Sequence, residues 1–163
     1  MTDSERLQVS QWILERNLHW IGAAEVKTGV IVAIDTAMLG GLAAAFSAVA
    51  PAERTAWATL FTIISAGCLG VALLCTAMSI LPRVTGPESS FIFFGKIVKR
   101  TTAEYADAFR KMTDAQLLED CMAQVHRNAE IACDKFKWVR MSMMWSFGAV
   151  LPWVAALTCL VRT

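Results

Sequence analysis

Three long apolar segments dominate the pattern of hydrophobic and polar positions. Residues 55–82 and 141–161 contain no Asp, Glu, Lys or Arg, and residues 28–52 contain a single charge, Asp35. A helix of roughly 20 residues crosses a hydrocarbon core about 30 Å thick, and the chain there must satisfy its backbone polar groups internally. The apolar runs are unbroken and do not alternate as barrel strands do. We therefore predict three transmembrane helices, at residues 28–50, 56–81 and 141–161.

The polar regions before and between these segments also follow a helical pattern. Residues 4–24 place apolar side chains at steps of three and four and carry Trp12 and Trp20, which suit the headgroup boundary. We predict an amphipathic helix there, lying in the interface or packed on another helix.

The segment 83–140 ends in a heptad seam that runs from Leu118 to Met143, with no breaker between Asp114 and Pro152. This pattern predicts one helix that continues into the last span, with a kink at Pro152. The whole chain, residues 1–163, is thus expected to be a single all-α membrane unit.

Composition and charge agree with a membrane protein. The hydrophobic fraction is 56%, and the mean hydropathy is +0.48. Ten basic residues lie in 83–140, three precede the first span, and Arg54 alone lies between the first two spans. The positive-inside rule therefore predicts a cytoplasmic N-terminus and a cytoplasmic 83–140 segment. Eight acids in that segment bring its net charge to +2 (ten minus eight), which argues against nucleic acid as a partner.

No pattern in the sequence indicates enzymatic chemistry. There is no Gly-rich phosphate loop, nucleophile elbow or G-x-G-x-x-G, so we expect a protein that is not an enzyme. His19 and His126 are the two histidines and do not have a metal-binding spacing. We expect no metal and no resident cofactor.

Asp35 is the sharpest anomaly within the apolar runs. It lies eight positions beyond Lys27, about 12 Å into the first span at 1.5 Å per residue. An intramembrane carboxylate is costly and by default marks an internal cavity or pathway. The alternative is that the span begins at residue 36 and Asp35 lies at the cytoplasmic boundary. The sequence leaves both interpretations open.

Two polar clusters are candidates for ligand binding. Trp20, Glu25 and Lys27 form either an aromatic belt with a snorkelling lysine or a pocket that stacks a flat ligand and meets an anionic group. Gln124 and Asn128 are four apart, hence on one helix face with Lys135 nearby, and can bind the edge of a base. The alternative is that they are ordinary polar residues of an exposed helix face.

Several short motifs, each present once, follow one another along most of the chain. They are Asn17-x-x-Trp20-Ile21, Glu25-x-Lys27, Phe93-Phe94-Gly95, and Asp120-x-x-x-Gln124 with Asn128, Ile131 and Lys135-Phe136. With these motifs the chain resembles the transmembrane effector family of the pyrimidine cyclase system for antiphage resistance, Pycsar. The family pattern has an aspartate where this chain has Glu25, so the chain departs from the pattern there but keeps the charge.

The resemblance implies an activating ligand and a membrane target. A partner cyclase would make cyclic CMP or cyclic UMP on infection, and the nucleotide would switch the effector to impair the bacterial inner membrane and stop growth. The ligand-binding residues would be Asn17, Trp20, Glu25, Lys27, Gln124, Asn128 and Lys135. Asp35 would line the lesion.

Close-packing stripes predict self-association. Gly40, Ala44 and Ala48 repeat every four positions, a spacing that lets helices approach closely in lipid and favours a homo-oligomer. Two other functions stay open: a constitutive oligomeric scaffold without a nucleotide ligand, and an effector that senses a cyclic oligonucleotide.

Overall fold

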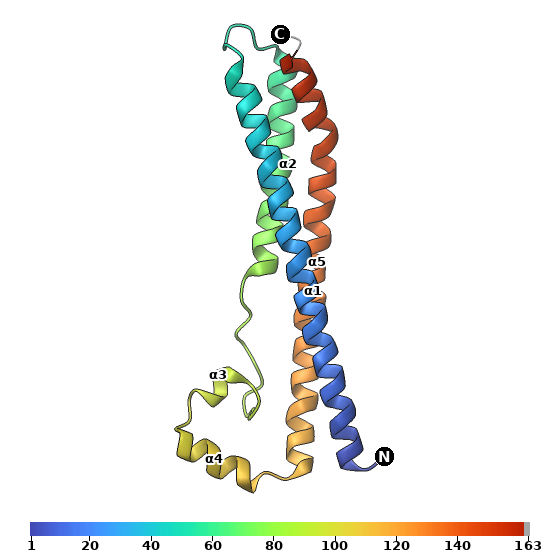
Figure 1. Cartoon of the computed structure of the whole chain (residues 1–163), viewed down its shortest axis with the longest axis vertical. Coiled ribbons are helices and arrows are strands. Elements are labelled where there is room, and N and C mark those ends of the chain that lie inside the picture. Colours follow the sequence, from blue (N-terminus) through green and yellow to red (C-terminus); the bar gives the residue numbers. More distant parts are fainter. Residues whose placement is uncertain (162–163) are drawn as a thin grey trace. The chain divides into compact units, whose positions relative to one another are not determined.

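The computed structural model describes residues 1–161, and this part of the chain is all-α, without strands. The five helices are α1 (Asp3–Ala48), α2 (Ala56–Ile80), α3 (Phe94–Ile97), α4 (Thr102–Lys111) and α5 (Asp114–Val161) (Figure 1). Three of them, α1, α2 and α5, are long and apolar enough to cross a membrane. The predicted fold class, an all-α protein with three transmembrane helices, is confirmed.

The chain divides into two compact units, which we describe separately. The polar unit contains residues 1–23 and 82–134, and the apolar unit contains residues 24–81 and the chain from Lys135 onward. Most charged side chains belong to the polar unit. The single unit expected from the sequence ends with Arg162 and Thr163, which lie outside the described residues.

Helix α1 contains both the segment expected as an amphipathic helix, residues 4–24, and the segment expected as the first span, residues 28–50. No break separates them, because charged residues such as Glu25 and Lys27 do not interrupt a helix and no proline is present before Pro51. Helix α2 follows after a short turn. The Thr55 side chain caps it by accepting a hydrogen bond from the backbone N–H of Ala58 at 3.1 Å.

The segment 83–140, expected to be a helical segment that follows turn residues at 85–87, begins with an irregular stretch. Residues 82–93 form no helix, because Pro82 and Pro87 lack the N–H that a helix interior needs. A Cβ at Gly86 would collide with the Phe93 ring, so glycine allows the close approach within this stretch. Beyond it, α5 runs without a break from Asp114 to Val161 and contains Pro152.

Helix α4 begins with a capping box. The Thr101 side chain accepts from the Glu104 N–H, and the Glu104 carboxylate accepts from the Thr101 N–H at 2.8 Å and from its hydroxyl at 2.9 Å. The backbone hydrogen bond from Thr101, followed by the hydroxyl bond, lowers the pKa of Glu104 below its ordinary value. At pH values above its ordinary pKa, the Glu104 carboxylate therefore stabilises the start of α4. This stabilisation is lost as the pH falls through the lowered pKa.

Candidate functional site: buried polar contacts in both units

Lys135 joins all three helices of the apolar unit. Its ammonium donates to Glu25 Oε1 at 3.0 Å and to the backbone carbonyl of Ser79 at 2.9 Å. Because α2 ends at Ile80, the Ser79 carbonyl has no N–H of the same helix to accept from. The lysine therefore binds α1 through its side chain and caps the C-terminal, partly negative end of α2.

Hydroxyl groups continue these contacts deeper into the apolar unit. Thr28 Oγ1 and Ser79 Oγ lie 3.4 Å apart, and Thr76 Oγ1 and Ser142 Oγ lie 2.6 Å apart. Ser142 also donates to the Ala72 carbonyl at 2.9 Å. All four hydroxyl residues are at most 2% exposed. Short polar side chains with small neighbours let membrane helices pack closely and bond to one another.

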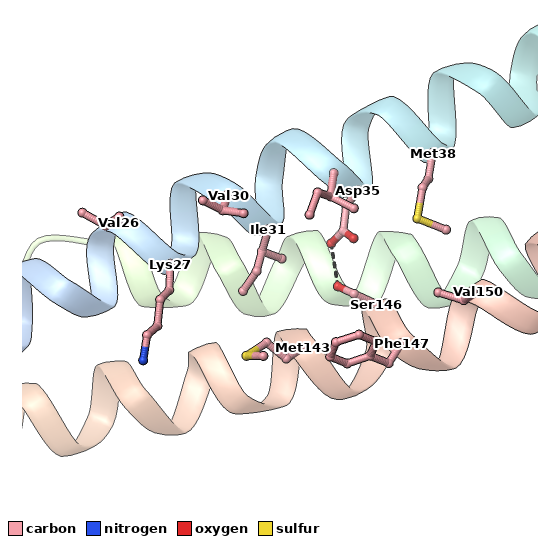
Figure 2. A pocket seen from close by; sticks show the side chains of 11 residues that line it. Val26, Lys27, Val30, Ile31, Asp35, Met38, Met143, Ser146, Phe147 and Val150 are labelled. Carbon is pink, nitrogen blue, oxygen red and sulfur yellow. Dashed lines mark hydrogen bonds between the residues drawn. The ribbon is translucent and has the colours of Figure 1, made fainter.

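Asp35 is completely buried between α1 and α5. Its Oδ2 accepts from Ser146 Oγ at 2.9 Å (Figure 2), whereas its Oδ1 has no hydrogen-bond partner among the described residues. Farther along the same pair of helices, the Trp153 indole N–H donates to the Met38 carbonyl at 2.9 Å. The span therefore holds an under-bonded carboxylate at a contact between two helices.

In the polar unit, Asp120 of α5 holds the irregular segment 90–93. Its Oδ2 accepts from the Phe91 N–H at 2.6 Å and from the Ile92 N–H at 3.2 Å. Ser90 Oγ accepts from the Phe93 N–H and from the Gln124 side-chain amide, both at 2.9 Å. Two polar residues one helical turn apart on α5 thus fix the backbone of this segment.

Two residues that contact Phe91, Arg100 and Asp120, each carry a buried polar atom without a partner among the described residues. The Arg100 guanidinium carbon lies 4.2 Å from the centroid of the Phe91 ring. Arg100 Nη1 and Asp120 Oδ1 are both buried and, within residues 1–161, have no hydrogen-bond partner; Arg83 Nη1 in the same unit is in the same state. Buried polar atoms are normally paired, so these are sites where a ligand or water can bind.

Most predicted ligand residues bond within their own unit. The amides of Asn17, Gln124 and Asn128 donate to the Val125 carbonyl, to Ser90 Oγ and to the Gln124 carbonyl, each at 2.9 Å. Trp20 is 50% exposed. In the apolar unit, Glu25 and Lys135 are paired, and the Lys27 ammonium lies 5.4 Å from the centroid of the Phe136 ring.

Sequence reasoning missed the hydroxyl partners in the spans and Arg100. Ser142 and Ser146 are four apart in a charge-free run, which was the available signal for a polar helix face. Arg100 was counted only as a topology signal. No group of three potential metal ligands occurs within the part of the chain that the structure describes.

Three apolar helices that bond to one another through buried polar side chains define a multi-pass α-helical membrane protein. Residues 9–162 match the family described as Pycsar effector protein domain. The chain belongs to this family, as its motifs indicated, and is therefore a membrane effector of antiphage defence rather than a cyclase.

The chain is also similar to a curated protein, Pycsar effector protein PtPycTM of Propioniciclava tarda. The two are 26% identical over 156 residues, which cover 88% of this chain and 74% of the relative. No solved structure matches.

Proposed function

We propose that a cyclic pyrimidine mononucleotide, cyclic CMP or cyclic UMP, activates this effector, which then disrupts the bacterial inner membrane and stops growth. The observation that carries the proposal is the family match over residues 9–162, because it includes both the polar unit and the apolar unit. The protein catalyses no reaction in this account. The polar unit holds nine of the fifteen basic residues, and the positive-inside rule therefore supports a cytoplasmic location for it, where a cyclase delivers its product.

The polar unit offers the chemistry that such a ligand needs. Arg100 Nη1 is a cationic donor for the cyclic phosphodiester, and charge-assisted hydrogen bonds to phosphate are the stronger kind. Asp120 Oδ1 is a free acceptor, suited to the exocyclic amine of cytosine or the ring N–H of uracil. Phe91 contacts both residues, through its ring to Arg100 and through its backbone N–H to Asp120, and its ring is a candidate surface for the base. Gln124 then positions the 90–93 segment through Ser90.

Helix α5 links ligand binding to the membrane. It contains Asp120 and Gln124 in the polar unit, and Lys135 and Ser146 in the apolar unit. A ligand shifts the protein only by its differential affinity for two arrangements. We infer that the bound arrangement repacks α5 against α1 and α2, and that several copies associate through the small residues of α1 to open a lesion.

The ligand claim is tested by calorimetry and thermal shift on the purified full-length protein. We expect binding of cyclic CMP or cyclic UMP and none of cyclic AMP. Arg100→Gln and Asp120→Asn should each weaken affinity by about tenfold or more, because each removes a charge-assisted hydrogen bond of about 1.5–3 kcal/mol.

Arg110→Gln is the matched control, since Arg110 is an exposed cation of the same unit that pairs with Asp107 at 3.2 Å. Its affinity should equal that of the unmodified protein. If both pyrimidine nucleotides gave no heat and no thermal shift, the ligand claim would be rejected, and the constitutive scaffold and the effector that senses a cyclic oligonucleotide would remain.

A further inference from the structure

A cavity of about 410 Å³ lies along the apolar unit between α1 and α5. Figure 2 shows its lining, with Lys27 at one end and Met38 and Val150 at the other. Its walls are almost entirely apolar, and Val30 and Phe147 remain 55% and 69% exposed. A cavity of this size is large enough for a small-molecule ligand, and its open apolar side faces the bilayer.

The length of this groove fits one leaflet. Lys27 and Met38 are eleven positions apart on α1, which is about 16 Å at a rise of about 1.5 Å per residue. The hydrocarbon core is about 30 Å thick, so the groove covers about half of it. One acyl chain of a phospholipid crosses one leaflet, so the length of the groove matches one acyl chain.

The Lys27 end of the groove is basic. A second hollow of about 310 Å³ adjoins it and is lined by Lys27, Phe136 and Arg140. Both cations are exposed, and neither forms a salt bridge with another described residue. The nearby carboxylate, Glu25, is already paired with Lys135 at 3.0 Å. This end therefore offers two free cations to an anion and no free carboxylate to a choline or an ethanolamine.

We propose that the groove binds one acyl chain of an anionic phospholipid, of the phosphatidylglycerol class, whose phosphate contacts Lys27 and Arg140. Asp35 and Ser146 also border the groove, but they are bonded to each other and Asp35 has no exposed surface. The lipid fills the gap between α1 and α5 next to this pair. The proposal concerns the resting protein in its membrane and does not depend on the nucleotide.

A photoreactive phosphatidylglycerol with a diazirine in its acyl chain tests this site on the full-length protein in phosphatidylcholine nanodiscs. We expect the adducts, mapped by mass spectrometry, to concentrate on the groove faces of α1 and α5. The double variant Lys27→Gln, Arg140→Gln should lower their yield by about tenfold or more, because each basic contact to an anionic lipid contributes to affinity. Lys137→Gln, which removes an exposed cation that lines neither hollow, should leave the yield unchanged.

Unlabelled phosphatidylglycerol should compete with the probe, and phosphatidylcholine should not. Three results would overturn the site: adducts spread evenly over α1, α2 and α5; equal labelling by a phosphatidylcholine probe; or competition by cyclic CMP or cyclic UMP, which would assign the two cations to the nucleotide. A fourth result, photochemical cross-links between two copies through the groove, would assign the groove to self-association instead. A melting temperature equal to that of the unmodified protein shows that the double variant is folded.

Discussion

Replacing Asp35 by leucine is expected to abolish propidium uptake by cells that co-express the effector and a pyrimidine nucleotide cyclase. In the resting protein the carboxylate is buried and accepts one hydrogen bond, from Ser146. Moving α5 away from α1 would expose it to the water of a lesion, whose wall would otherwise be apolar at this depth. Leucine is favoured over aspartate at the centre of a span by about 3 kcal/mol or more, so lost uptake would not result from failed insertion.

Two further variants separate charge from polarity and from packing. Asp35→Asn keeps the shape and the bond to Ser146 but removes the charge, and we expect it to reduce uptake of the cationic dye. Ser65→Ala changes a buried hydroxyl of α2 that has no partner among the described residues, so uptake should stay normal. Unchanged uptake by Asp35→Leu, at equal protein level in the membrane, would reject Asp35 as a lining residue.

Replacing Lys135 by methionine is expected to lower the melting temperature in detergent by about 3 to 16 °C. The side chain of Lys135 is 7% exposed and that of Glu25 is 59% exposed. The pair with the exposed carboxylate is worth at most about 1 kcal/mol, whereas the buried bond from the ammonium to the Ser79 carbonyl is worth about 1.5–3 kcal/mol. Each kcal/mol corresponds to about 2–4 °C in a chain of this size.

Glu25→Gln and Lys137→Met are the matched controls for this substitution. The first removes only the exposed partner and should shift the melting temperature by no more than a few degrees. The second removes an exposed lysine two positions along the same helix and should leave it unchanged. If Glu25→Gln were as destabilising as Lys135→Met, the ion pair and not the cap of α2 would hold the three helices together.

The spans were predictable because charge-free runs are a property of the sequence alone. The boundary expected between two helices at residues 24–28 is absent, because α1 runs through it. Glu25 and Lys27 indicate the edge of a membrane segment but do not end a helix. Pro82, Gly86 and Pro87 are signals for the end of the second span and for a turn, but they do not indicate that the irregular stretch extends to residue 93. Local breakers decide where a helix ends, and hydropathy decides only where it can be buried.

The sequence indicated several residues that form buried polar contacts, but not the partners of those residues. Lys135 and Gln124 were singled out for their chemistry, yet their partners, the Ser79 carbonyl and Ser90, lie on other segments of the chain. A serine hydroxyl in a membrane helix can bond to a carbonyl of its own helix. The sequence around Ser142 therefore does not reveal that its hydroxyl meets another helix. Which polar groups meet across helices depends on packing, and the sequence alone does not specify it.

The central claim, that a cyclic pyrimidine nucleotide causes the membrane lesion, is tested most directly in vesicles. The purified full-length protein is reconstituted into phosphatidylcholine and phosphatidylglycerol vesicles loaded with carboxyfluorescein, and each nucleotide is added in turn. We expect dye release with cyclic CMP or cyclic UMP, and none with cyclic AMP, cyclic GMP or buffer. The same release without nucleotide, or no release with either pyrimidine nucleotide, would contradict this claim.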